Sequence, residues 1–263
     1  MAVEQTGTRR WFRGLGGRPA ADTRLFCLHY AGGGASLYRS WSDAFPSSTE
    51  VVAVQLPGRE NRLAEAAYDS MGPLAEELAA RLVPHLDRPY AFFGYSMGAR
   101  LGWVLSQLLR DRAVRQPGLL FAAASPGPCL RTPVSGWNEP DEGLVAYLRE
   151  LGGTAPEVLD QPDLLSLLLP TLRADLTAVA TWPYPEHAPL EVPIHALAGE
   201  DDPYASPERM RAWERETAAG FRLNVLPGGH FFVKSAVRRT LDLVVRDMGL
   251  LTATAADGAV ETG

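Results

Sequence analysis

Short apolar runs alternate with helical hydrophobic patterns along most of this chain, and this alternation limits the folds open to it. Runs with the length and composition of buried strands lie at 24–30, 50–56, 89–95, 118–124, 192–198 and 221–226. Patterns of helical period lie between or after them, at 71–86, 99–110, 206–218 and 235–250. Strands separated by helices pair in parallel and are covered by helices on both faces. The sequence therefore predicts an α/β fold with a mostly parallel central sheet.

One stretch, residues 130–190, breaks this alternation. It has no convincing strand pattern and is typical of two helices, at 140–151 and 162–181, with Pro170 bending the second. An insertion between two strands of a parallel sheet lies over the carboxyl ends of the strands, where such sheets carry their sites. We therefore interpret it as a helical lid. The expected domains are an N-terminal segment at 1–20, a body at 21–129 and 191–251, the lid at 130–190 and a flexible tail at 252–263.

Composition and charge argue against several classes of protein. The 263 residues are 46% hydrophobic, which is enough for one domain with a large core. The net charge of −6, without a basic tract, argues against nucleic acid as a partner. The first 22 residues lack the apolar region of a signal peptide, and no uninterrupted apolar run is long enough to span a membrane, so we expect a cytoplasmic protein. Cys27 and Cys129 have neither metal-ligand nor disulfide-framework spacing, and Cys27 is expected to be a buried structural thiol.

The pattern G-x-S-x-G occurs at Gly94-Tyr95-Ser96-Met97-Gly98, where an apolar run ends and a helical pattern begins. Small residues two positions on either side of a serine let the backbone turn sharply from strand to helix and leave the hydroxyl exposed. The five-residue pattern alone is a weak signal, but a strand before it and a helix after it are the context that a nucleophile elbow requires. We predict that Ser96 is a nucleophile, against the alternative of a turn whose small residues serve packing alone.

Five histidines could supply the base that a serine hydroxyl needs. His230 follows the last predicted strand through two glycines, and it fits the chain order serine, acid, histidine of the elbow fold. His29, next to a run of glycines, is its competitor. His85 is expected to end a surface helix, and His187 to be solvated in a proline-rich stretch. His195 is expected to pack within a strand.

The acid that orients the imidazole should follow the penultimate strand. Three candidates stand there in a row, Glu200, Asp201 and Asp202. A run of carboxylates is usually a solvated turn, so we expect one of them to matter. Asp202 precedes Pro203, in a turn that can direct its side chain back to the sheet, and it is favoured over Asp201, with Glu200 third.

An oxyanion hole needs two backbone N–H groups. One should come from Met97, directly after the nucleophile, and the other from the loop after the first strand, residues 29–34. The glycines of this loop let its backbone approach a substrate closely. A glycine-rich loop can also bind phosphate, but no lysine-serine or lysine-threonine pair follows and no G-x-G-x-x-G spacing is present. The sequence shows no cluster of metal-ligating residues.

Longer stretches of the chain resemble a known family, the type II thioesterases that accompany polyketide and nonribosomal peptide synthetases. The resemblance extends from about residue 10 to residue 250. Its motifs are RWF, LFCLHYAGGGASLYRSW, VVAVQLPGRENR, FFGYSMGA, LRELGGT, LLLPTLRADLTAVATW, AGEDDP and LPGGHFFV.

The resemblance implies an α/β-hydrolase fold with a helical lid, and a function. Members of the family hydrolyse acyl groups from the phosphopantetheine arm of acyl or peptidyl carrier proteins, and so remove stalled or aberrant acyl units. The family's triad matches Ser96, Asp202 and His230, and its oxyanion hole matches the amides of Ala31 and Met97. The resemblance implies no cofactor beyond the phosphopantetheine that the substrate carries. We expect a monomer.

Two other functions use the same sequence features. A broad serine esterase or lipase acting on free oxygen esters would need the same triad, so a rate comparison between thioester and ester must separate the two. A non-catalytic binding module on this fold should lack a member of the triad, and none is missing.

A run of leucines in the expected lid has two interpretations. These residues either pack the lid on the body, which is the more common role, or line an acyl channel. They are Leu164, Leu165, Leu167, Leu168 and Leu169.

Overall fold

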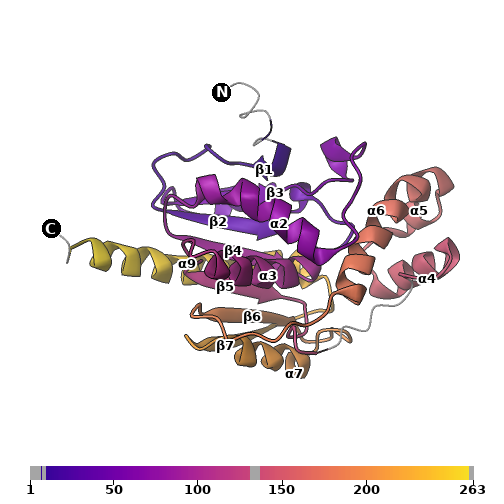
Figure 1. The fold of residues 1–263 in the computed structure, drawn as a ribbon. Helices are drawn as coiled ribbons and strands as arrows, with labels where there is room; N and C mark the ends of the chain where they lie inside the picture. Colours follow the sequence, from indigo (N-terminus) through magenta and orange to yellow (C-terminus); the bar gives the residue numbers. More distant parts are fainter. Residues whose placement is uncertain (1–6, 8–9, 131–136, 261–263) are drawn as a thin grey trace.

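The computed structural model describes residues 7, 10–130 and 137–260, and side chains as far as residue 251. Parts of the expected N-terminal segment, lid and tail, at 1–6, 8–9, 131–136 and 261–263, lie outside the described residues. Within the described residues, one seven-stranded sheet lies at the centre of the fold and helices cover both of its faces (Figure 1). The α/β fold predicted from the alternation of strands and helices is confirmed.

The sheet has the strand order β1-β3-β2-β4-β5-β6-β7, and all neighbouring strands are parallel except β1 and β3. Each parallel strand begins and ends within two residues of a predicted apolar run. All of them except the edge strand β7 are buried along most of their length, and strands buried on both faces are apolar throughout. The short β1 was not predicted. The strands are β1 Phe12–Arg13, β2 Thr23–Leu28, β3 Thr49–Val54, β4 Tyr90–Tyr95, β5 Leu119–Ala123, β6 Ile194–Gly199 and β7 Phe221–Leu226.

Helices α2 (Met71–Leu82) and α3 (Met97–Asp111) cover one face of the sheet (Figure 1). Helix α2 ends four residues before the predicted end, because Pro84 has no N–H to continue it and a 3-10 turn follows at Val83–His85. The apolar side chains of α2 recur every three or four residues and are buried against the sheet and α3. They include Met71, Leu74, Leu78 and Leu82.

The opposite face of the sheet is covered by α9 (Val237–Val260) and by two 3-10 turns, at Ala35–Tyr38 and Trp41–Ala44. A short helix, α8 (Phe232–Ser235), precedes α9. Helix α9 continues to Val260, into the segment from residue 252 expected to be a flexible tail, and the flexibility of that segment stays a prediction. The sequence there is rich in alanine, which has the highest intrinsic helix propensity.

The segment between β6 and β7 and the middle of the lid also differ from prediction. The helix expected at 206–218 consists of α7 (Pro207–Met210) and a 3-10 helix at Arg211–Glu216. In the lid, a helix that was not predicted, α5 (Pro156–Leu159), lies between the two that were. Helix α5 is four residues long and begins with proline, so it has no apolar period that a sequence pattern could reveal.

The two predicted lid helices are α4 (Asp141–Leu151) and α6 (Pro162–Thr181), and Pro170 lies inside α6 without ending it. They lie beyond the carboxyl ends of the strands (Figure 1). By length and composition alone α6 could cross a membrane, but it also packs in a small apolar core of the lid. That core consists of Leu144, Tyr147, Leu169, Leu172 and Leu176.

Candidate active site

Ser96 occupies a sharp turn between β4 and α3. Its φ of 54° lies in the left-handed region, which costs free energy for a residue with a side chain. A Cβ atom at Gly94 would lie 2.3 Å from the carbonyl oxygen of Gly98, and one at Gly98 would lie 2.2 Å from the carbonyl oxygen of Leu28. Both glycines are therefore required for the turn to close. The Ser96 amide donates a hydrogen bond of 2.8 Å to the carbonyl of Ala123, which ties the turn to the neighbouring strand.

The structure brings Ser96, Asp202 and His230 together. His230 Nε2 lies 3.2 Å from Ser96 Oγ, and His230 Nδ1 lies 2.8 Å from Asp202 Oδ2. An ionised carboxylate only accepts hydrogen bonds, so Nδ1 carries the proton and Nε2 of the neutral ring presents its lone pair to the serine hydroxyl. This is the geometry that a general base requires. The catalytic roles of the three residues stay predictions.

The three acidic residues after β6 have different environments. Asp202 is buried, whereas Glu200 and Asp201 are exposed. Asp202 Oδ1 accepts hydrogen bonds of 2.9 and 3.0 Å from the amides two and three residues later. Burial disfavours the charged form, but His230 and these amides stabilise the carboxylate more strongly, so the pKa of Asp202 lies below its ordinary value. Asp202 is therefore the acid that can hold His230.

His230 is placed by the loop after β7. Gly228 in this loop has a φ of 101°, and the carbonyl oxygen of His230 accepts a hydrogen bond from the Tyr95 hydroxyl. The imidazole ring packs edge-on against three aromatic rings, those of Tyr95, Tyr204 and Phe231. The ring is thus fixed on several sides, which holds Nε2 toward Ser96.

His29, the competitor for the role of base, does not contact Ser96. Its Nδ1 lies 2.9 Å from the carbonyl oxygen of Tyr30, and the side chain is buried. Burial, followed by the charge of Arg59, lowers its pKa to about 3. His29 is therefore a neutral core histidine beside the glycine loop.

The remaining histidines also lie away from Ser96, and one of them corrects an expectation. His187 was expected to be solvated, but its side chain is only 8% exposed and packs edge-on against Trp103, with Nε2 3.2 Å from Glu216 Oε2. His195 lies in β6 as predicted but pairs with Asp247. His85 packs against the ring of Phe12.

The amides proposed for the oxyanion hole, those of Ala31 and Met97, donate no hydrogen bond to any residue that the structure describes. Both residues line a small cavity of about 40 Å³ together with Ser96 and His230. Met97 is the first residue of α3, where the helix dipole favours negative charge. The arrangement suits an oxyanion, and the assignment of these two amides stays a prediction.

A further cavity of about 130 Å³ opens beside Ser96 and His230 and is covered by the lid. The leucine run takes several roles: Leu165 and Leu168 line this cavity, Leu169 packs in the lid core, and Leu164 and Leu167 are exposed. The leucines that line the cavity come from α4 and α6 and are Leu148, Leu151, Leu165, Leu168, Leu172 and Leu176.

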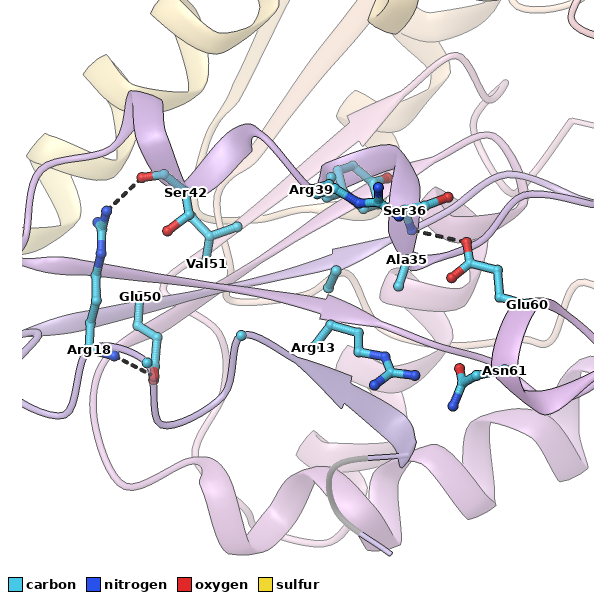
Figure 2. A pocket seen from close by; sticks show the side chains of 14 residues that line it. Arg13, Arg18, Ala35, Ser36, Arg39, Ser42, Glu50, Val51, Glu60 and Asn61 are labelled. Atoms are coloured by element: carbon cyan, nitrogen blue, oxygen red, sulfur yellow. Dashed lines mark hydrogen bonds between the residues drawn. The ribbon is translucent and has the colours of Figure 1, made fainter. Parts of the chain in front are cut away.

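A larger cavity, of about 500 Å³, lies along the edge formed by β1 and β3 (Figure 2). It is lined by arginines, among them Arg13, Arg18 and Arg39, and by no histidine or cysteine. Arg18 serves the fold there, since its guanidinium donates to the carbonyl oxygens of Ser42 at 2.6 Å and Thr49 at 2.9 Å. The two carboxylates that line it are engaged as well, Glu50 with Arg24 at 2.7 Å and Glu60 with the Ser36 amide at 3.0 Å, whereas the smaller cavity holds a serine and a histidine 3.2 Å apart.

Known proteins that are similar to this chain include thioesterases. The model of a thioesterase domain matches residues 23–247. The chain is 38% identical over 248 residues to linear gramicidin dehydrogenase LgrE of Brevibacillus parabrevis, covering 93% of this chain and 94% of the relative. It is 35% identical over 245 residues to the gramicidin S biosynthesis protein GrsT of Aneurinibacillus migulanus, covering 93% of this chain and 96% of GrsT. The structure of RedJ, a thioesterase from the prodiginine pathway of Streptomyces coelicolor, matches with a TM-score of 0.83 and 38% identity, over 86% of this chain and 91% of RedJ.

Proposed function

The chain belongs to the thioesterase family, and from that premise we propose that it is a type II thioesterase that hydrolyses acyl groups from the phosphopantetheine thiol of carrier proteins. The observation that carries the proposal is the placement of Ser96, His230 and Asp202 under an apolar lid. Its role would be editing: it would remove aberrant or stalled acyl units during polyketide or nonribosomal peptide synthesis.

Acylation begins at the serine. His230 Nε2 removes the hydroxyl proton as Ser96 Oγ attacks the thioester carbonyl carbon. Asp202 holds Nδ1 and stabilises the imidazolium. The carbonyl oxygen becomes an oxyanion, which the amides of Ala31 and Met97 stabilise. The tetrahedral intermediate then expels the pantetheine sulfur, and the proton on Nε2 passes to it, leaving an acyl ester on Ser96.

Deacylation repeats the steps with water. His230 Nε2 takes a proton from a water molecule that attacks the ester carbonyl, and the second tetrahedral intermediate expels Ser96 Oγ, which recovers the proton. The products are the free acid and the carrier thiol. The carrier domain brings phosphopantetheine with it, so the enzyme needs no cofactor of its own. The monomeric, cytoplasmic state expected from the sequence stays a prediction.

The cavity at Ser96 bears on the acyl group. Its walls are leucine side chains, and its volume of about 130 Å³ is well below that of most ligand pockets. A short apolar acyl unit fits these walls, and a long chain would require the lid to move. Short-chain acyl carriers are therefore the substrates to test first.

Two other activities have less support. A serine esterase would use the same three residues on oxygen esters. The name of the relative LgrE states a dehydrogenase activity, but the present chain has no G-x-G-x-x-G motif for a dinucleotide, whereas it does place a serine against a histidine and a carboxylate. Hydrolysis of a thioester is the better supported reaction.

The experiment compares two substrates with the same acyl group, an acylated holo carrier protein and a simple oxygen ester. We expect wild-type protein to release free acid from the carrier faster than from the ester, and Ser96→Ala to lose activity on both by a factor of about 10⁴ or more. Ser96→Ala removes only the hydroxyl group and leaves the Cβ atom and the backbone in place. The far-ultraviolet circular dichroism spectrum should therefore be unchanged. Activity on the ester alone would favour the esterase.

A further inference from the structure

A buried ion pair joins the lid to the body beside Gly32, which lines the same cavity as Ser96. Asp175 of α6 is 1% exposed, and Arg59, in the loop after β3, is 6% exposed. Arg59 Nη1 donates to Asp175 Oδ2 at 2.6 Å, and Nη2 donates to Oδ1 at 2.9 Å. This bidentate geometry fixes the orientation of both side chains and is stronger than a single hydrogen bond.

The same carboxylate also binds the loop at residues 29–34, which we call the oxyanion loop. The Gly32 amide donates to Asp175 Oδ2 at 2.7 Å, and Arg59 Nη1 donates to the carbonyl of Gly33 at 3.3 Å. Gly32 has a φ of 74°, which the two contacts help to hold. The ion pair therefore fixes the peptide groups that directly follow Ala31, while the Ala31 amide itself stays without a hydrogen bond to any described residue.

We propose that Asp175, supported by Arg59, is a positioning residue for the oxyanion hole: it orients the oxyanion loop so that the Ala31 amide points at the reacting carbonyl. Because Asp175 belongs to the lid, the hole is complete only when α6 lies in its observed place. This inference rests on the proposed function in one respect, the use of the Ala31 amide for the oxyanion. It assigns to the lid a part in the chemical step beyond covering the acyl group.

The charge of Arg59 is essential to this arrangement. A lone carboxylate behind the oxyanion loop would repel the negative charge that develops on the substrate oxygen. Arg59 neutralises Asp175 at the shortest range, so the loop gains a strong acceptor for Gly32 without a net negative charge. Positioning and charge balance are therefore supplied by one pair.

A second contact, made by Thr171, allows the positioning role of Asp175 to be distinguished from simple attachment of the lid to the body. It lies on α6 one turn before Asp175, and its hydroxyl donates to the carbonyl of Gly58. This contact also joins the lid to the body and is also buried, but it does not involve the oxyanion loop. Thr171→Val is therefore a matched control that removes one attachment and leaves the loop contacts in place.

The test uses a short-chain p-nitrophenyl ester, which needs the triad and the oxyanion hole but no carrier protein. We expect Asp175→Ala to lower kcat by a factor of about 30 to 100 with KM within about twofold, since misplacing one oxyanion donor costs up to that much. Asp175→Asn keeps an acceptor for Gly32 but loses the charge that pairs with Arg59, so kcat and boronic acid affinity should fall by a smaller factor, about 3 to 10. Thr171→Val should stay within about twofold of wild type.

A boronic acid inhibitor adds a readout that a merely structural role would not change. It forms a tetrahedral adduct with a catalytic serine, so its affinity should fall in Asp175→Ala by the same factor as kcat, and stay unchanged in Thr171→Val. An unchanged affinity in Asp175→Ala, or an equal loss of kcat in Thr171→Val, would overturn the proposal. If Asp175→Ala does not fold, Asp175→Asn decides, because an unchanged kcat in that variant together with unchanged boronic acid affinity contradicts it. Absence of carrier hydrolysis with ester activity retained would refute the proposed function and leave this inference standing.

Discussion

Two histidine–carboxylate pairs lie near opposite ends of strand β6, and one of the two pairs meets a serine. Asp202, after the carboxyl end, binds His230 Nδ1 at 2.8 Å, and His195, near the amino end, binds Asp247 Oδ2 through Nδ1 at 2.7 Å. Both carboxylates are buried and both have a pKa below the ordinary value, Asp247 through arginine and His195 contacts that outweigh its burial. The pairing alone therefore does not identify an active site.

The surroundings of the two pairs explain the difference. Asp247 also accepts hydrogen bonds from Arg246 at 2.7 Å and Arg222 at 3.3 Å, so its charge is used to join α9 to the sheet. Among the residues that the structure describes, Asp202 accepts hydrogen bonds only from two backbone amides besides His230, and the second nitrogen of that ring faces Ser96. A histidine paired with a carboxylate can act as a general base only if its other ring nitrogen meets a nucleophile. In this sheet that occurs at the carboxyl ends of the strands, where parallel sheets carry their sites.

Replacing the two histidines gives the largest contrast. His230→Ala should lower kcat by a factor of about 10⁴ or more, because the serine loses its base. His195→Ala should leave kcat within about twofold and lower the free energy of unfolding by roughly 1–3 kcal/mol, since Asp247 loses a buried hydrogen bond. Steady-state kinetics and urea unfolding of both variants measure these effects. A comparable loss of kcat in both variants would show that the two pairs are not functionally distinct.

Replacing the two carboxylates, Asp202 and Asp247, should give a contrast in the same direction as replacing the two histidines, but a smaller one. Asp202→Asn removes the acceptor that keeps the proton on His230 Nδ1, and we expect kcat to fall by a factor of about 10³ to 10⁴. Asp247→Asn should affect the free energy of unfolding, by roughly 1–3 kcal/mol, and not kcat. If Asp202→Asn retains most of its activity, the neighbouring Asp201 would have to be tested as the acid.

The smallest effect concerns His29, a buried histidine that pairs with no carboxylate in the described part of the chain. Its pKa of about 3 lies far below the unfolded value of about 6.5, so the unfolded chain takes up the proton first. The stability that neutral His29 contributes is complete above about pH 6.5 and is lost as the pH falls toward 3, at up to about 1.4 kcal/mol per pH unit. Between pH 7 and pH 5, the free energy of unfolding should therefore fall by about 2 kcal/mol less in His29→Asn than in wild type.

Urea unfolding at the two pH values measures this difference. His195→Asn is the control: burial lowers the pKa of His195, and the Asp247 contact opposes that effect, so its removal should change the pH dependence less. An equal pH dependence in wild type and His29→Asn would contradict the assignment of His29 as a neutral core residue.

Much of this architecture could be predicted from the sequence because its signals are local. Buried parallel strands appear as apolar runs, and the glycines around Ser96 mark a turn that tolerates no side chain. The short β1 gave no signal, because Phe12–Arg13 pairs with β3 over two positions only. The catalytic roles and the domain boundaries were predicted in the same way and remain to be tested.

What could not be predicted depends on residues far apart in the chain. His187 lies in a proline-rich stretch that is typical of a solvated loop, but Trp103 and Glu216 come from other elements to bury it. The contact between Gly32 and Asp175 joins residues 143 positions apart, and no local pattern indicates it. Long-range polar contacts of this kind set the geometry of the site, and only the folded chain shows them.

The order of the strands has a consequence for partial unfolding. Ser96 follows β4, which has neighbours on both sides, whereas His230 follows β7, an edge strand whose residues are mostly half-exposed or exposed. Edge elements open at a lower free energy than central ones, and their amide hydrogens exchange sooner with solvent. The base can therefore be displaced while the strand that carries the nucleophile stays paired, so in mild denaturant enzymatic activity should disappear before circular dichroism reports any loss of the sheet.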